Sequence, residues 1–164
     1  MSLLDDLAAR LVAQGVGTLA VGNPPPANSI FVGSAAVIPV GMGPYITLSE
    51  TGGMTPTRVQ NQAGAKTQRP TVQVLVRAGR IIGVQEAYPA ARATSRLAYQ
   101  ALDGVFNTML SGSFYLSVTA RQEPTDMGLD ATGLRVQVVF NLNVERQSDS
   151  VAPAPSWAQG GWMQ

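Results

Sequence analysis

The chain contains no cysteine and no histidine, and both absences restrict its chemistry. Without cysteine it can form no disulfide, no thiolate nucleophile and no cysteine–metal site. Without histidine it lacks the commonest general base and the commonest ligand of transition metals. The sequence therefore predicts neither an enzyme activity nor a bound metal or cofactor.

Charged residues are also scarce. They make up 13% of the 164 residues, whereas an average soluble domain has about 25%. The net charge is +1 and Lys66 is the only lysine, so the chain lacks the basic excess typical of nucleic-acid binding. A thinly charged surface loses little hydration when another protein covers it. This composition favours a component of an assembly.

No apolar run is long enough to cross a membrane. The most apolar window, residues 30–46, is interrupted by three glycines and two prolines, which prevents a spanning helix. The N-terminal segment is acidic early, unlike the basic start of a secretory signal. We therefore expect a protein that is made in a cytoplasm and has no membrane partner.

The elements that are present predict an α+β fold, in which an antiparallel (mixed) β-sheet packs against two α-helices. The first helix is expected at Leu3–Val12, where leucines recur at three- and four-residue spacing after a capping box made by Ser2 and Asp5. The second is expected at Glu86–Leu102 and ends at Asp103-Gly104.

Three segments alternate between apolar and polar residues, as strands with one buried face do. Such strands form an antiparallel sheet whose apolar face is covered by the amphipathic helices. A further strand is expected at residues 45–50, and shorter apolar pieces at 29–33 and 35–40 are candidate strands. The three clear strands are Thr71–Ala78, Phe114–Arg121 and Leu134–Glu145.

The sequence thus predicts a single domain at residues 1–146 and a low-complexity tail at residues 147–164. Within the domain, Thr51 to Arg69 shows no periodicity and is expected to be a long extended loop. Loops of this length in compact domains are usually functional or disordered. Because the loop holds few apolar residues, chiefly Met54 and Val59, we expect it to be an arm that contacts another chain.

Two groups of residues are candidate ligand sites. Gly52-Gly53 lacks the glycine spacing and the strand-to-helix context of phosphate loops, so a flexible loop is preferred to anion binding. Glu123, Asp126 and Asp130 lack the order of an EF-hand, and a hairpin connection rich in turn formers is preferred to a calcium site.

Two further groups are interpreted as surfaces. Arg77, Arg80, Arg92 and Arg96 have few interleaved aromatics, so a solvated or interface face is preferred to a nucleic-acid site. Trp157 and Trp162 in the tail are candidate anchors on a partner, because large aromatic side chains often provide such anchors. An idle tail remains the alternative.

The order of these segments resembles the minor capsid or tail terminator proteins of long-tailed bacteriophages. The resemblance covers residues 3–146 and rests on the order and spacing of short motifs. These are Thr51-Gly52-Gly53, "RPTVQVLVR", Leu102-Asp103-Gly104, and Pro124 with Gly128, Asp130, Gly133 and Arg135 before a strand that contains Phe140-Asn141.

The resemblance implies a virion protein of the tail and neck that has no enzyme activity and is made in the host cytoplasm. It implies a ring of identical subunits, commonly a hexamer, that caps the tail tube protein and meets the head–tail connector or head completion protein. Genomic DNA would pass through this ring without sequence-specific binding. The arm residues expected to contact a neighbouring subunit or the tube are Thr51, Gly52, Gly53, Met54, Arg58 and Arg69.

Two alternatives remain open at this point. One is another neck or tail adaptor, or another minor capsid protein. The other, from a different class, is a small-ligand or anion-binding enzyme that uses the glycine pair and the arginines.

Overall fold

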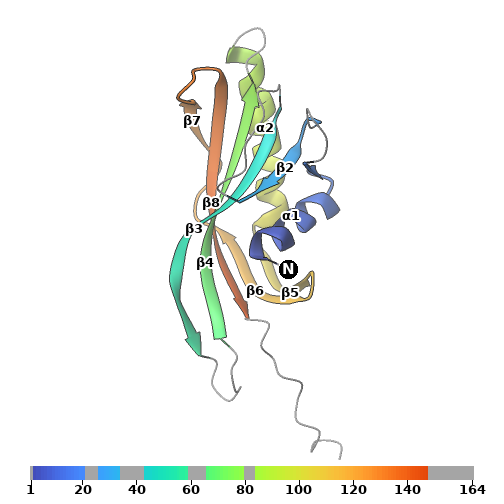
Figure 1. The fold of residues 1–164 in the computed structure, drawn as a ribbon, viewed down its shortest axis with the longest axis vertical. Coiled ribbons are helices and arrows are strands. Elements are labelled where there is room, and N and C mark those ends of the chain that lie inside the picture. The colour runs from blue at the N-terminus through green and yellow to red at the C-terminus, as the bar shows by residue number, and fades with distance from the viewer. Residues whose placement is uncertain (1, 21–25, 34–42, 59–65, 80–83, 148–164) are drawn as a thin grey trace, which may run out of the picture.

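The computed structural model describes residues 2–20, 26–33, 43–58, 66–79 and 84–147. The strands of these residues form one eight-stranded sheet in the order β1-β2-β3-β4-β8-β6-β5, with β7 also paired to β8 (Figure 1). Pairs β1–β2 and β2–β3 are parallel, and all the other pairs are antiparallel. The strand bounds are β1 Thr18–Leu19, β2 Ser29–Val32, β3 Tyr45–Arg58, β4 Lys66–Gly79, β5 Val105–Leu110, β6 Ser113–Ala120, β7 Thr125–Leu129 and β8 Arg135–Gln147.

The centre of the sheet is the long pair of β4 and β8. Alternate side chains of both strands are buried, as the apolar alternation predicted. The other edge of β8 is shared, because β6 pairs with its C-terminal half and β7 with its N-terminal half. All three clear strands are therefore confirmed, as is the predicted fold class.

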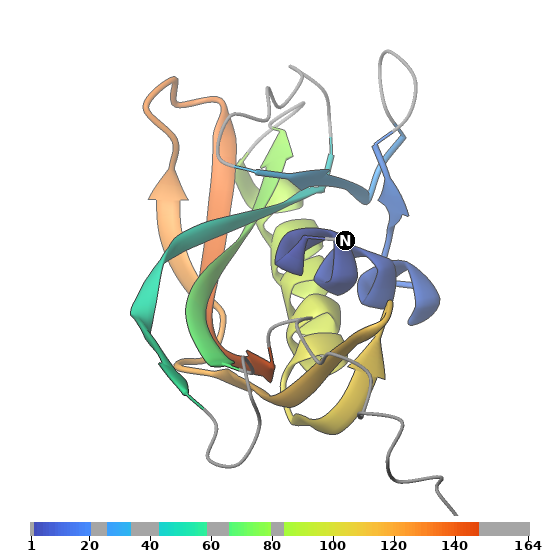
Figure 2. The same ribbon diagram turned by 60° about the horizontal axis from the view of Figure 1, so that its bottom comes forward.

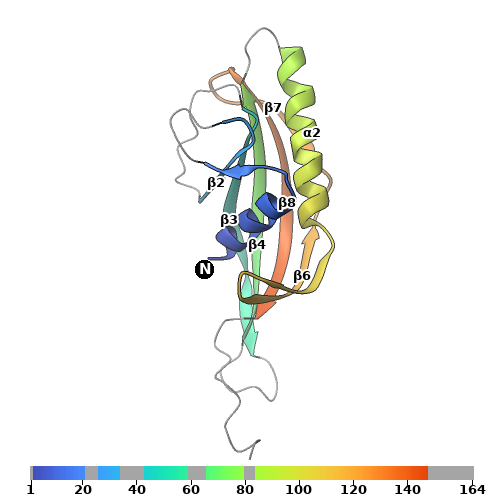
Figure 3. The same ribbon diagram turned by 90° about the vertical axis from the view of Figure 1, so that its right-hand side faces the viewer.

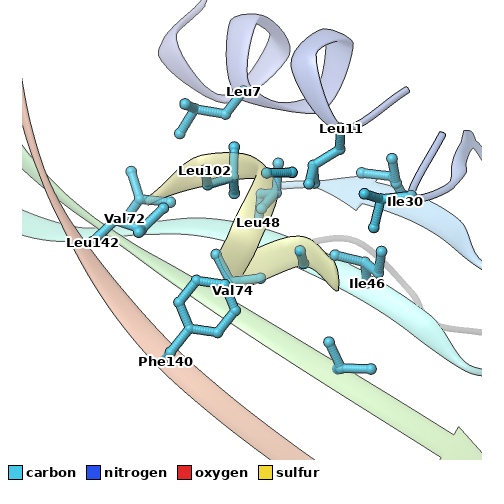
Figure 4. Close-up of a cluster of buried hydrophobic side chains, with 14 of the residues drawn as sticks. Leu7, Leu11, Ile30, Ile46, Leu48, Val72, Val74, Leu102, Phe140 and Leu142 are labelled. Carbon is cyan, nitrogen blue, oxygen red and sulfur yellow. The ribbon is translucent and has the colours of Figure 1, made fainter. Parts of the chain in front are cut away.

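Both helices of the described residues, α1 (Leu3–Ala13) and α2 (Val84–Leu102), lie on the concave side of the curled sheet (Figure 2). Seen from the side, α2 runs along the sheet (Figure 3). Leucines of α1 meet valines and Phe140 from the sheet in one apolar core (Figure 4). Burial of this apolar area is the main force that stabilises the fold.

Helix α1 begins at the predicted capping box. The Ser2 hydroxyl accepts a hydrogen bond from the backbone N–H of Asp5 at 3.2 Å, and the Asp5 carboxylate accepts one from the N–H of Ser2 at 3.1 Å. Hydrogen bonding from Ser2 lowers the pKa of Asp5. Helix α2 begins at Val84, two residues before the predicted start, so Pro89 lies inside the helix, beyond its first turn.

The prediction of a structureless loop at Thr51–Arg69 is wrong for the part of it that is described. Residues Thr51–Arg58 continue β3, and Lys66–Arg69 begin β4, so the two strands form a ribbon. The alternation of apolar and polar residues is absent from Thr51–Arg58 because all of these residues are exposed, so neither face of β3 is buried there. Two register shifts, at Thr51 and between Met54 and Thr57, further interrupt the period of two.

Some strands were not predicted. β5 carries Asn107 with φ 45°, which breaks its alternation, and β7 is exposed along its whole length. The candidate strand at residues 29–33 is confirmed as β2, whereas residues 35–40 lie outside the described residues. Strand β8 runs one residue beyond the expected end of the domain, to Gln147.

Candidate subunit interface

The ribbon of β3 and β4 extends beyond the core as an arm, defined here as residues 51–58 and 66–69. Its strands pair antiparallel, with Met54 opposite Arg69 and Arg58 opposite Lys66. In Figures 1 and 3 it projects below α1 and β5. In the arm β4 also pairs with β8, at Thr67–Gln147 and Gln68–Arg146, whereas β3 has no second strand beside it among the described residues. A surface that packs against this exposed edge of β3 would stabilise the arm. We therefore still expect this segment to act as an arm, in the form of paired strands instead of an irregular loop.

The paired glycines create the bend at which the arm leaves the sheet. Thr51 is the extra residue of a bulge, because Glu50 pairs with Val72 whereas Gly52 pairs with Thr71. Gly52 has φ 127°, which side chains disfavour, and a Cβ on Gly53 would lie 2.6 Å from the carbonyl oxygen of Arg69. The glycines therefore serve a close backbone approach within the chain.

The root of the arm is fixed by contacts with β8. The Nε atom of Arg69 lies 2.8 Å from Oε1 of Glu145 in a half-exposed ion pair. Arg146 donates a hydrogen bond from Nε to the side-chain oxygen of Gln68 at 2.9 Å. Arg58 and Met54 are exposed farther along the arm, and 69% of Met54 is accessible. Of the predicted arm residues, Arg69 thus anchors the root, whereas Met54 and Arg58 are accessible to a partner.

A buried polar network connects this root to α1. Asp6 is fully buried, and the Tyr115 hydroxyl donates a hydrogen bond to its Oδ2 atom at 2.7 Å. Arg146, which holds Gln68, places an NH1 atom 3.9 Å from the same oxygen. This network was not predicted from the sequence. The one signal was the position of Asp6 on the apolar face of α1, three residues after Leu3.

An open groove of about 350 Å³ runs along the arm root, a feature that the sequence did not indicate. Backbone of Gly52 and Gly53 forms part of its wall, and Leu3 and Arg146 line it as well. Arg146 is held by Gln68 and Asp6. The groove is therefore the junction between the arm and α1.

Replacing Tyr115 with phenylalanine is expected to destabilise the subunit by about 1–3 kcal/mol, because the buried Asp6 carboxylate loses a hydrogen-bond donor. Burial, followed by the hydrogen bond and the charge of Asp6, raises the pKa of Tyr115 above its ordinary value of 10.0. The neutral phenol therefore stabilises the fold below about pH 10, and this contribution is lost as the pH rises further. Denaturant unfolding from pH 7 to 11 measures both effects.

Tyr88→Phe is the matched control, since the hydrogen bond that the Tyr88 hydroxyl accepts from Arg92 is exposed. Equal unfolding free energies for Tyr115→Phe and Tyr88→Phe would contradict the role given to the network.

The acidic residues Glu123, Asp126 and Asp130 lie on and around β7, in the connection between β6 and β8. Asp126 accepts a hydrogen bond from the N–H of Gly128 at 2.8 Å, and Asp130 accepts one from the Thr132 hydroxyl at 2.7 Å. The Thr132 bond lowers the pKa of Asp130. These contacts are typical of a hairpin connection, the interpretation that the sequence favoured over a calcium site. The connection also contains strand β7.

The arginines do not form one surface. Arg77 lies on β4 between Val76 and Ala78, which face the helices, so it faces the opposite side of the sheet. Arg92 and Arg96 are exposed on α2. Arg80, Trp157 and Trp162 lie outside the described residues.

Neither described helix is long and apolar enough to cross a membrane. Within the same residues, no three Asp or Glu side chains gather as a metal site would require.

No protein-family model matches the chain, and no curated protein does. Among solved structures, the chain is similar to a chain of the virion of a native gene transfer agent particle. The two are 16% identical, the match covers 70% of this chain and 78% of that chain, and the TM-score is 0.47. Such values establish neither a shared family nor a shared activity.

Proposed function

We propose that this chain is a virion structural protein of a long-tailed bacteriophage or a related particle, and that it acts as the tail terminator. In this role, identical subunits form a ring, commonly of six, that caps the tail tube and joins it to the head–tail connector. DNA passes through the ring without sequence-specific binding. The sequence resemblance over residues 3–146 gives this proposal its specific form.

The observation that carries the proposal is the exposed arm. Eight consecutive residues of β3, Thr51–Arg58, are exposed although they belong to a strand. The arm is anchored firmly at its root by Arg69 and Gln68 and offers its outer half to solvent. Such an extension suits a subunit that reaches a neighbour, because contacts there add stability that its own core does not provide.

Two alternatives make different predictions. Another neck adaptor would share the fold and the ring, and only its position in the particle would differ. A small-ligand enzyme would use the groove at the arm root, and a ligand would then raise the melting temperature of a monomer. Of the two arginines that line the groove, Arg69 is paired with Glu145 and Arg146 is held by Asp6 and Gln68, which favours the structural role.

Deleting the gene for this chain in cells that produce the particle tests this function. A tube without its cap has no signal to stop growing and no surface for the connector. We expect tails of abnormal and variable length that are not joined to heads, with both defects restored by supplying the protein. Tails of normal length joined to heads, seen by electron microscopy, would contradict the terminator role.

A further inference from the structure

Another open groove, of about 270 Å³, lies between α1 and the turn that connects β5 to β6. It is named here the α1 groove, and Figure 1 shows β5 beside α1. One wall consists of Met109, Leu110 and Ser111. The α1 residues of the other wall recur at three- and four-residue spacing and so share one side of the helix. They are Asp6, Ala9, Arg10, Ala13 and Gln14.

The walls of the α1 groove suit an aromatic ring. Met109 is a large apolar side chain and yet is 59% exposed, and on the α1 side the exposed Ala9 is small. Cavities of about 150 Å³ accept benzene, so the groove has room for fused rings. Arg10 is a fixed part of the wall, because its Nε atom donates a hydrogen bond to the carbonyl oxygen of Ala101 at 2.7 Å. A guanidinium group attracts the face of an aromatic ring.

Asp6 adds a buried acceptor to the α1 groove. Its side chain is fully buried, and its Oδ2 atom accepts the hydrogen bond from the Tyr115 hydroxyl. Its Oδ1 atom is buried as well, and no described residue donates a hydrogen bond to it. A buried acceptor without a donor destabilises a fold. A tryptophan side chain combines a large apolar ring with one N–H donor, and it therefore matches both properties of the groove.

The C-terminal tail leaves the sheet close to the α1 groove. Near the end of β8, Arg146 pairs with Tyr115 of β6, which in turn pairs with Thr108 of β5. Two strand spacings amount to about 10 Å. Trp157 follows Gln147 by about ten residues, and an extended chain of that length spans up to about 33 Å. Trp157 can therefore reach the groove of its own subunit.

We infer that Trp157 docks in the α1 groove of its own subunit, with its ring against Met109 and its N–H towards Asp6. A short tether keeps Trp157 near the groove at an effective concentration on the order of millimolar, which favours docking within one chain over docking on another copy. Trp162 lies farther along the tail, so its tether is longer. The inference concerns one subunit and does not depend on the proposed function.

Tryptophan fluorescence tests the inference, because the chain has two tryptophans and each can be observed alone. Trp162→Phe leaves Trp157 as the only tryptophan, and Trp157→Phe leaves Trp162. We expect the emission of Trp157 to be blue-shifted, and acrylamide to quench it at least about three-fold less than Trp162, because neighbouring side chains shield a docked ring. Emission from Trp157 like that of a ring in water, or equal shielding of both rings, overturns the inference.

Filling the groove tests where the ring docks. Ala9→Arg is combined with Trp162→Phe; Ala9 is exposed and arginine is a good helix former, so α1 should be preserved. Acrylamide should then quench Trp157 freely. Ala93→Arg makes the same change at an exposed position of α2 and should leave Trp157 shielded. If melting curves show that Ala9→Arg is unfolded, Met109→Ser alters the opposite wall instead. Shielding of Trp157 that persists in the folded variant overturns the inference.

Co-expression distinguishes docking within one chain from docking on another copy. The Ala9→Arg, Trp162→Phe chain is produced together with a chain in which both tryptophans are replaced by alanine. Only the second chain then has a free groove, and only the first has a tryptophan. Trp157 should remain open to acrylamide, because the groove of its own subunit is filled. If co-expression restores the shielding of Trp157, the tail docks on another copy and the inference is overturned.

Discussion

Val138→Asp is expected to unfold the subunit. Val138 lies in the middle of β8, is 1% exposed, and faces the helices on the concave side of the sheet. An aspartate there would bury a charge without a partner. Uncompensated buried charges cost about 3–5 kcal/mol, a large fraction of the roughly 5–15 kcal/mol by which domains are stable.

Asn143→Asp places the same carboxylate at an exposed position of the same strand. It should change the unfolding free energy by less than about 0.5 kcal/mol. Circular dichroism and thermal melting of the two variants provide the comparison. A Val138→Asp protein that melts like the parent would mean that the face of β8 towards the helices is not the core.

Removing the arm is expected to abolish assembly while leaving the subunit folded. The change replaces Gly53 to Arg69 with a short Gly-Ser turn that connects β3 to β4 above the bend. Most of the described residues that it removes are exposed, since β3 is exposed from Glu50 onwards, although the buried Thr67 and the pairs of Thr67 and Gln68 with β8 are lost as well. The monomer should therefore stay folded with a somewhat lower melting temperature than the parent, whereas oligomers and tube capping are lost.

The deletion also removes the ion pair between Arg69 and Glu145. Glu145→Gln breaks that pair alone and should assemble normally, because half-exposed pairs contribute at most about 1 kcal/mol. Analytical ultracentrifugation across a concentration series separates the two proteins. If the shortened chain assembles and caps tails as the parent does, the segment is a dispensable ribbon and the interface lies elsewhere.

Those parts of the fold that bury one face were predictable from the sequence. The alternation in β8 indicates a strand because its inward residues, from Val136 to Val144, are buried, whereas its outward residues other than Val139 are at least partly exposed. The stripe of α1 has the same origin, although Val12 at its end is 39% exposed. Apolar periodicity records burial, so it identifies the elements that make the core.

The arm could not be recognised as a ribbon for the same physical reason. Its residues are exposed, so selection for burial leaves no period of two, and the bulges at Thr51 and before Thr57 shift the register. Its shortage of apolar residues did indicate a segment outside the core. The network of Asp6, Tyr115 and Arg146 joins residues about 30 to 140 positions apart. No local pattern reports such a contact.

The position of this chain in the intact particle tests the central claim most directly. A cryo-electron microscopy map of the particle should contain a ring of this chain between the last ring of the tail tube and the connector. In that ring, arms should reach from each subunit to the next. A map that places the chain elsewhere in the particle, or that shows a neck without it, would contradict the account.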